Sequence, residues 1–373
     1  MPVGLPAKTT YANGDVFSAD DINSTNGTIN LIGQTNNFYA GKNRIINGDF
    51  FVNQRNFSSS TATGYGFDRW QNVTDGSSGT ATFSAQTFTP GAAPVAGYEA
   101  RNFLRCVTTG QSVAGVFTLF EQFIEDVRSI AGQTVTISFW AKAATGTPKI
   151  ATEVEQYFGS GGSPSSSTST YAGQVTISTS WARYSVTVAV PSISGKTIGT
   201  TANTSFSAIN LWVSSGTTFN SRTGSLGIQS NTFDIWGVQV EAGSTATAFQ
   251  TASGSIQGEL ALCQRYYYRI GGEQTFQAMA LGWGNGSAGA YIHITTPVTM
   301  RVAPTALDYS TLVIGDLINN NQAVTVLLLT GNYGGSKVQT LSATVSSGLT
   351  VNRPYGLYAN NSTSAFVGLS AEL

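Results

Sequence analysis

Hydrophobic and polar residues alternate along much of the chain between residues 43 and 252. In one segment, Val135, Ile137, Phe139 and Ala141 take every second position. The segments 182–190, 207–214 and 232–243 repeat this period of two. Such alternation predicts antiparallel strands that cover a core from one side. Many such strands separated by turns are typical of a β-sandwich of the jelly-roll type.

A second region with the same alternation occupies residues 273–373. The segment 276–300 predicts a hairpin that turns at Gly284, Asn285 and Gly286. The segments 323–331, 337–346 and 364–373 predict further strands. We therefore predict an all-β chain in which a second, small β-domain follows the sandwich.

Residues 253–272, between the two β-regions, carry a helical pattern instead. Ile256, Leu260, Cys263 and Tyr267 lie at positions i, i+4, i+7 and i+11, which is one stripe of a helix. Glu259 lies in the first turn, where the helix dipole favours an acidic group. A helix of this length is marginal in water. We therefore predict a linker helix that packs on its neighbouring domains or on copies of itself.

Residues 1–42 form a polar leader of a different character. Ser18 is a candidate N-cap, and Asp20 and Asp21 follow in the first turn of a short predicted helix. The segment is too short to fold alone. We expect it to dock on a partner protein or on sister chains.

Composition narrows the range of partners. Only 10% of the 373 residues are charged, against ~25% in an average protein, and the net charge is −1. Binding to phosphates requires clustered Lys and Arg, so we expect no nucleic-acid partner. No run of about 18 apolar residues is present, so we expect no insertion into a membrane.

Two residue types that often carry chemistry are scarce, and a third feature fails its context. Cys106 and Cys263 are isolated from each other, and we interpret both as small buried hydrophobic residues. His293 is the only histidine and lies in a predicted strand, where we expect it at a sheet surface or an interface. The glycine pattern at 284–289 is followed by a strand rather than a helix, which argues against a dinucleotide site.

Carboxylates offer the strongest case for an enzyme. Glu153 and Glu155 alternate on a predicted strand and share one face, and Glu121, Glu125 and Asp126 form a second group. Glycan cleavage requires two carboxyl groups, one of which holds a proton in an apolar pocket. Nothing in the sequence marks such a pocket, so we interpret these groups as solvated structural carboxylates and expect no enzymatic activity.

Aromatic residues in predicted turns are candidates for ligand contacts, because aromatic rings stack on the apolar faces of sugars. Packing within the turns is the alternative interpretation. The candidates are Trp283, Tyr333, Tyr355 and Tyr358.

The stretches NRIINGDFFVNQRNF (43–57) and GYGFDRWQNV (64–73) resemble phage tail fibre and tail-associated proteins with carbohydrate-binding jelly rolls of the family 4/9 type. Similar stretches follow at 119–143, 233–250, 258–269 and 296–305, and residues 14–23 are similar to the attachment leaders of such fibres. The resemblance implies a homotrimeric virion component made in the host cytoplasm. Its leader would attach to the tail or baseplate, and its distal β-domain would contact a glycan or protein of the host surface.

Two site expectations depend on this resemblance. In a trimer, three copies of the linker helix would bury Leu260, Cys263 and Tyr267 around one axis. Jelly rolls of this family often hold a structural calcium ion between their first and last strands, and the oxygen ligands here would come from Asn47, Asp49 and Asp234. No other cofactor is expected.

Three functional hypotheses follow. The first is a tail fibre protein that recognises the host surface through its distal β-domains. The second is a purely structural baseplate or capsid decoration protein. The third is a glycan depolymerase that uses Glu153 or Glu155.

Overall fold

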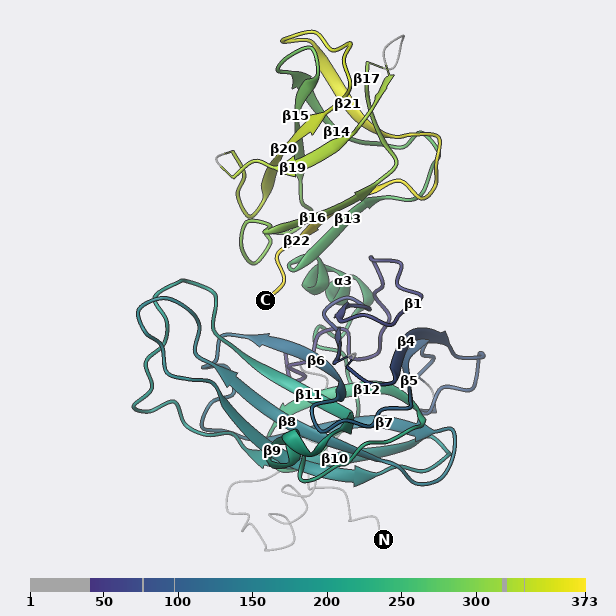
Figure 1. The fold of residues 1–373 in the computed structure, drawn as a ribbon, viewed down its shortest axis with the longest axis vertical. Coiled ribbons are helices and arrows are strands. Elements are labelled where there is room, and N and C mark those ends of the chain that lie inside the picture. The colour runs from purple at the N-terminus through teal and green to yellow at the C-terminus, as the bar shows by residue number, and fades with distance from the viewer. Residues whose placement is uncertain (1–40, 76, 97, 317–320, 332) are drawn as a thin grey trace, which may run out of the picture.

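The computed structural model describes residues 41–75, 77–96, 98–316, 321–331 and 333–373. These residues form two β-rich lobes, one above the other, with the short helix α3 (Ile256–Gln264) between them (Figure 1). The predicted all-β class is therefore confirmed. Almost all of the predicted helical leader, residues 1–42, lies outside the described residues. No helix in the described part of the chain is long and apolar enough to span a membrane.

The first lobe, here called the sandwich, consists of two antiparallel six-stranded sheets, as predicted. In spatial order the first sheet contains β1 (Ser59–Ser60), β4 (Thr80–Thr87), β5 (Asn102–Thr109), β12 (Thr232–Ala242), β7 (Thr134–Ala143) and β10 (Ala182–Ala189). The second contains β2 (Gly64–Tyr65), β3 (Gln71–Thr74), β6 (Phe117–Glu125), β11 (Phe206–Ser215), β8 (Lys149–Tyr157) and β9 (Thr168–Thr176).

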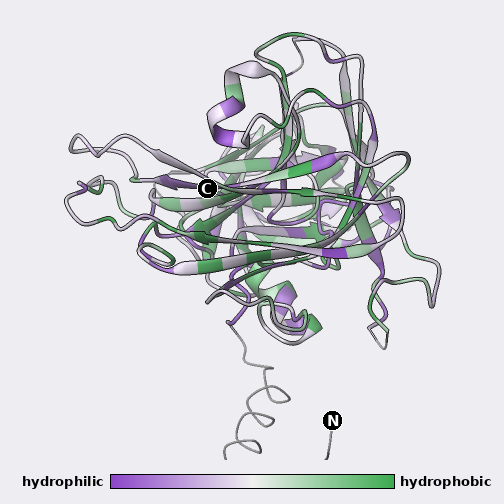
Figure 2. Cartoon of the chain, turned by 90° about the horizontal axis from the view of Figure 1, so that it is seen from below, coloured by the Kyte–Doolittle hydropathy of each residue, from purple (hydrophilic) through white to green (hydrophobic). Residues whose placement is uncertain are grey.

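The sandwich core comes from the alternating positions of both sheets. Hydrophobic and hydrophilic residues alternate along its strands (Figure 2). Ile137, Phe139 and Ala141 of β7 are buried against residues such as Ile209 and Leu211 of β11. Burial of apolar surface at ~25 cal/mol per Å² supplies the main stabilisation of such a core. The remaining faces of the strands therefore decide what the outside of each sheet can do.

The segment NRIINGDF crosses one end of the sandwich and is held by buried asparagines. The Asn43 side chain donates to the carbonyl oxygens of Val238 and Gln250. Gly48 has no room for a side chain, because a Cβ atom would lie 2.1 Å from the oxygen of Val238. Asn47 has a positive φ of 57°, which asparagine tolerates better than most residues. The Asn and Gly residues of this motif are thus explained by backbone geometry.

The predicted linker helix over residues 253–272 is only half helical. Ser255 caps α3 by accepting a hydrogen bond from the Gly258 N–H at 3.1 Å. The helix ends at Gln264, and Tyr267 already begins strand β13 (Tyr267–Gly271). The tyrosines suit a strand, and β13 pairs along its whole length with β22 (Phe366–Ser370). This long-range pairing overrides the helical periodicity of the sequence.

The second lobe, here called the tip, contains the remaining strands. A three-stranded sheet has the order β13, β22 and β16 (Ala306–Ser310). A seven-stranded sheet has the order β18 (Asn321–Ala323), β17 (Leu312–Gly315), β21 (Pro354–Ala359), β14 (Ala278–Gly284), β15 (Gly289–Thr295), β20 (Val338–Thr344) and β19 (Val326–Leu329). The two sheets enclose one core that includes Ile292, Leu341 and Val367. The other helical pieces of the described chain, a 3₁₀ turn (Thr217–Phe219) and α2 (Asn220–Thr223), lie on the sandwich.

The last residues of the sequence return from the tip to the sandwich. The Glu372 carboxylate forms an ion pair with Arg69, whose side chain is completely buried, and a second one with Arg55 at 3.4 Å. The Tyr65 hydroxyl donates to the Leu373 carbonyl oxygen at 3.3 Å. These contacts, here called the clasp, join the lobes independently of α3.

Candidate functional site

The outer face of the seven-stranded sheet in the tip carries a group of mostly aromatic side chains that are exposed or half-buried. Trp283 on β14 lies directly opposite Tyr291 on β15, and Leu281 lies opposite His293. Their neighbours in sequence, such as Ile292 and Ala290, point into the core. Together with Tyr333, which follows β19, these side chains form what is here called the aromatic face: Leu281, Trp283, Tyr291, His293 and Tyr333.

The rings of the aromatic face contact one another and leave large surfaces open to solvent. The Trp283 ring lies 4.8 Å from the His293 ring and 6.4 Å from the Tyr291 ring, and Tyr291 lies 6.2 Å from Tyr333. Trp283 is 42% exposed, and both Leu281 and Tyr333 are 69% exposed. Contiguous exposed rings of this kind mark binding surfaces more often than isolated apolar residues do.

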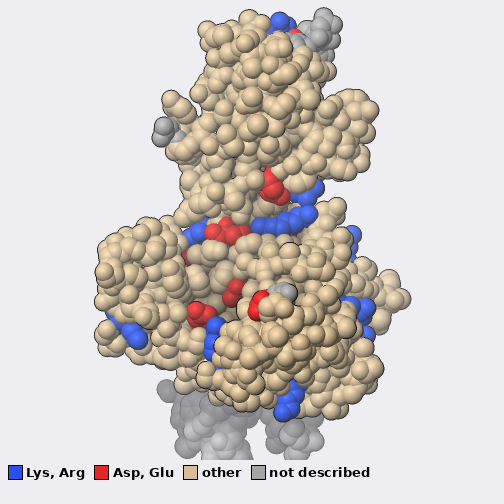
Figure 3. Space-filling view, viewed as in Figure 1, with Lys and Arg blue, Asp and Glu red and all other residues tan. Residues whose placement is uncertain are grey.

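Hydrogen-bonding groups lie beside these rings. The Thr340 hydroxyl donates to the Tyr333 carbonyl oxygen at 2.7 Å and lies 3.0 Å from His293 Nδ1. Since the hydroxyl has only one proton, neutral His293 must donate from Nδ1, which leaves Nε2 as an acceptor. Few charged side chains appear on the visible side of the tip (Figure 3). The five residues of the aromatic face include no Lys, Arg, Asp or Glu, so this face suits a neutral ligand with hydroxyl groups.

Two of the four candidate aromatic residues are buried, in line with the alternative interpretation that they pack within the turns. Tyr355 is 2% exposed, and its hydroxyl accepts a hydrogen bond from the Thr350 N–H at 3.0 Å. Tyr358 is 7% exposed, and its ring covers Gly356, where a Cβ atom would lie only 2.2 Å from the tyrosine hydroxyl. Tyr355 and Tyr358 thus pack within the tip, whereas Trp283 and Tyr333 belong to the aromatic face.

The sequence also contained a signal for the other members of the aromatic face. In β15, Tyr291 and His293 alternate with the buried residues Ala290, Ile292 and Ile294. The expectation that His293 lies at a sheet surface is therefore confirmed. Its pairing with Trp283 depends on the register of β14 and β15 and could not be inferred from the strand alone.

The three side chains assigned to a trimer axis do not form one stripe. Cys263 is completely buried and Tyr267 is 2% exposed within a single chain, whereas Leu260 is 37% exposed. The Tyr267 hydroxyl donates to the Asp308 carboxylate at 3.0 Å, and the Arg55 guanidinium lies 3.7 Å from the centre of its ring. Cys263 and Tyr267 are thus buried without a second copy. Both cysteines are buried, as predicted.

Of the second predicted carboxylate group, only Glu121 lies beside Glu153 and Glu155 on the outer face of the second sandwich sheet. Glu125 and Asp126 form ion pairs with Arg265 and Arg128 instead. β11 lies between β6 and β8, so that Asn210 is opposite Glu121 on one side and Glu153 on the other. Arg222 of α2 forms ion pairs with Glu153 at 2.6 Å and with Glu155 at 3.0 Å. Glu121, Glu153, Glu155, Asn210 and Arg222 are here called the carboxylate face. Acidic side chains gather in a hollow of the sandwich below the tip (Figure 3).

Glu153 was predicted to be solvated, and this is wrong. Its side chain is fully buried and also accepts hydrogen bonds from Asn210 at 2.9 Å and from the indole N–H of Trp212 at 3.0 Å. Glu121 is different, because it accepts no hydrogen bond from any described side chain. Burial, together with the charge of Glu155, raises the pKa of Glu121 to about 7. Glu153 is therefore structural, and Glu121 is the unpaired acid of this face.

The predicted calcium ligands are occupied by other contacts. Asn47 uses its amide to hold the carbonyl oxygens of Val52 and Asp68. Asp234 forms a two-pronged ion pair with Arg105 at 2.6 and 2.9 Å, which supplies the positive charge that calcium would have brought. Asp49 accepts a hydrogen bond from the Tyr98 hydroxyl at 2.8 Å. Among the described residues, no group of three or more His, Cys, Asp or Glu could hold a metal ion.

No protein-family model matches this sequence, and no curated protein matches it. Among solved structures, the enzymatically active domain of bacteriophage CBA120 tailspike protein 4 gives a TM-score of 0.30 at 15% identity, over 54% of this chain and 21% of that chain. The CBM22-2 xylan-binding domain from Paenibacillus barcinonensis Xyn10C has a TM-score of 0.30 at 17% sequence identity, and the match covers 50% of this chain and 98% of that chain. TmCBM61 in complex with β-1,4-galactotriose has a TM-score of 0.27 at 12% sequence identity, and the match covers 54% of this chain and 99% of that chain.

Proposed function

We propose that this protein binds a neutral carbohydrate of a host cell surface through the aromatic face, as part of a phage tail fibre. The observation that carries the proposal is a contiguous set of rings in which the exposed Trp283 and Tyr333 both contact the half-buried Tyr291. Aromatic rings stack on the C–H faces of sugars, while His293, held by the buried Thr340 hydroxyl, is a polar group that can bond a sugar hydroxyl. Binding rather than cleavage is the proposed activity.

The proposal extends to the assembly. A homotrimeric virion component, attached to the tail or baseplate through residues 1–42, would present three aromatic faces at once. Because linked sites bind in an effectively intramolecular way, weak contacts of single faces would add up to firm attachment. The solved structures similar in part to this chain include a phage tailspike domain and carbohydrate-binding modules, a combination compatible with this role.

The test is binding of the intact protein to a panel of bacterial surface polysaccharides. We expect Trp283→Ala to weaken binding of the recognised polysaccharide by about tenfold or more. Phe276→Ala is the matched control, because Phe276 is 64% exposed on the tip but lies outside the ring contacts of the aromatic face. Equal affinities of the wild type and Trp283→Ala would refute the proposed site.

A second candidate function is supported by the aliphatic side of the same sheet. Leu328 is 57% exposed, and Val326 and Val338 are at least 40% exposed. Exposed aliphatic residues next to aromatic ones also suit contacts between copies of a structural virion protein. Leu328→Lys distinguishes the two functions: it would dissociate an assembly held by this face, seen as a fall in solution mass, and would leave binding of a polysaccharide by the rings intact.

A further inference from the structure

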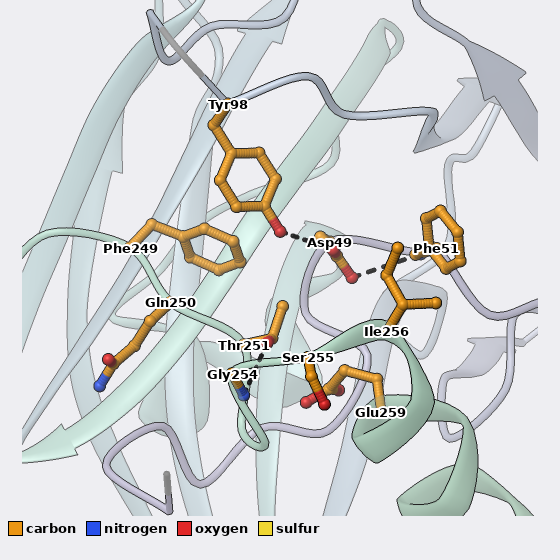
Figure 4. Close-up of a pocket in the computed structure, with 10 residues that line it drawn as sticks. All are labelled: Asp49, Phe51, Tyr98, Phe249, Gln250, Thr251, Gly254, Ser255, Ile256 and Glu259. Carbon is orange, nitrogen blue, oxygen red and sulfur yellow. Dashed lines mark hydrogen bonds between the residues drawn. The ribbon is translucent and has the colours of Figure 1, made fainter. Parts of the chain in front are cut away.

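A separate pocket lies on the sandwich beside the first turn of α3 (Figure 4). Its volume is about 200 Å³, enough for one small head group. Three segments far apart in the sequence form it: residues 49–51, the loop at Tyr98, and residues 249–259. The lining is mostly apolar, with Phe51, Tyr98, Phe249 and Ile256 around it. The pocket belongs to neither the aromatic face nor the carboxylate face.

Two carboxylates line this pocket without a cation. Asp49 is 7% exposed and Glu259 is 2% exposed. The pocket lining contains no Lys or Arg, and neither carboxylate forms an ion pair with any residue that the structure describes. Burial raises the pKa of both carboxyl groups, and the charge of Asp49 raises the pKa of Glu259 further. A buried carboxylate is costly unless an opposite charge or a proton compensates it, so a cation in the pocket would stabilise the charged forms of both groups.

The walls of the pocket are fixed before any ligand arrives. The Tyr98 hydroxyl donates to Asp49 Oδ2 at 2.8 Å, and its ring meets the Phe249 ring edge to face at 5.6 Å. Glu259 accepts backbone hydrogen bonds from Asn47 at 2.8 Å and from Ser253 at 2.6 Å. Aromatic rings next to carboxylates are the surroundings in which an organic cation is bound, since ring faces attract positive charge.

We propose that this pocket binds the primary ammonium group of a small organic ligand, with Asp49 and Glu259 as its anionic partners and the rings of Tyr98 and Phe249 around its carbon atoms. Amino sugars and ethanolamine head groups both carry this chemistry. A calcium ion does not fit, because it requires six to eight oxygen ligands. The apolar side chains that make up much of the lining cannot supply them.

The experiment is a ligand-observed NMR titration of the full chain with glucosamine, ethanolamine and glucose. We expect both amines to bind in the millimolar range or tighter and glucose not to bind, because only the amines supply the missing charge. Tighter binding of glucosamine would identify an amino sugar as the source, and tighter binding of ethanolamine would identify a head group. Equal affinities for glucose and glucosamine would overturn the proposal, as would the absence of binding by both amines.

Two variants and two controls locate the binding. Asp49→Asn keeps the shape and the Tyr98 hydrogen bond and should weaken binding of both amines about tenfold. Ile256→Lys changes a residue that is 59% exposed, so the fold should tolerate it, and its own ammonium group should occupy the pocket and block the amines. Leu260→Lys adds the same charge one turn further along α3, outside the pocket lining, and should leave the affinity within about twofold.

The second control is Trp283→Ala, which should leave amine binding unchanged even where it abolishes polysaccharide binding by the aromatic face. Full amine affinity in Ile256→Lys would show that the amines bind elsewhere and would refute the proposed pocket. Loss of amine binding in Trp283→Ala would refute it as well.

Discussion

The carboxylate face of the sandwich and the aromatic face of the tip are both outer faces of antiparallel sheets. They differ in whether their polar and aromatic side chains are buried and paired or exposed to solvent. On the sandwich, Trp212 is 1% exposed and donates to Glu153, which Arg222 neutralises. On the tip, Trp283 is 42% exposed, and its ring contacts the rings of Tyr291 and His293 on the same face. The sandwich thus pairs Trp212, Glu153 and Arg222 with one another, whereas the tip leaves its rings available.

This difference shows that chemically rich residues do not by themselves indicate a binding surface. Glu153, Arg222 and Trp212 would rank above Leu281 and Tyr333 in any search for reactive residue types. Their contacts are already complete, however, and removing one leaves another buried and unpaired. The contrast can be tested by changing matching residues on the two faces.

The largest contrast should come from the two tryptophans. Trp212→Ala should lower the free energy of unfolding by about 4 to 5 kcal/mol, because a fully packed ring is removed and Glu153 loses a donor. Trp283→Ala should cost less than about 1 kcal/mol, since much of its ring is already in water. Chemical denaturation measures both. Similar losses in the two variants would contradict the contrast between the faces.

The next effect concerns the ion pair that closes the carboxylate face. Arg222→Met keeps much of the side-chain volume but leaves Glu153 buried without its cation, and should cost about 3 to 4 kcal/mol. Arg128→Met is the control, because Arg128 forms an ion pair with Asp126 in which the two side chains are 59% and 48% exposed. This variant should lower the free energy of unfolding by less than about 1 kcal/mol. Thermal melts near neutral pH would compare them. A melting temperature of Arg222→Met equal to that of the wild type would contradict the contrast.

The smallest of the three effects depends on pH. Glu121 has its pKa raised from 4.5 to about 7, so the folded state holds this proton more tightly than the unfolded state. The wild type should therefore lose stability as the pH rises from 4.5 to about 7, and should remain less stable above that range.

Glu121→Gln imitates the protonated group and removes this dependence. The variant should match the wild type at about pH 4 and should be more stable by on the order of 2 kcal/mol at about pH 8. Denaturation curves at the two pH values provide the measurement. A constant difference between the two proteins across this range would show that Glu121 titrates normally.

Local patterns predicted the strands well and the helix badly, for one physical reason. Alternation in β7 and β12 marks the side chains that face the core, and both segments form strands as predicted. The stripe from Ile256 to Tyr267 matched a helix by spacing alone. In the structure, Tyr267 is buried because β13 pairs with β22, which lies about a hundred residues later. Pairing over such a distance leaves no trace in the local sequence.

The same limit applies to the candidate sites. Trp283 and Tyr333 were found among turn aromatics, but Tyr355 and Tyr358 looked identical in sequence and are buried. Glu121 and Glu153 could not be placed together, because their meeting depends on β11 entering the sheet between β6 and β8. The sequence shows which side chains each strand carries. It does not show which residues lie beside them on the neighbouring strands.

The clasp has a mechanical consequence. The tip is joined to the sandwich through the peptide chain at α3 and through Glu372 on the buried Arg69. Further hydrogen bonds cross between the lobes, such as the one that Arg301 donates to the Asn203 carbonyl oxygen. A body held at a single point can swivel, but several fixings that lie apart resist twisting between the lobes. A load applied at Trp283 would therefore reach the sandwich as torque instead of being lost in a loose hinge.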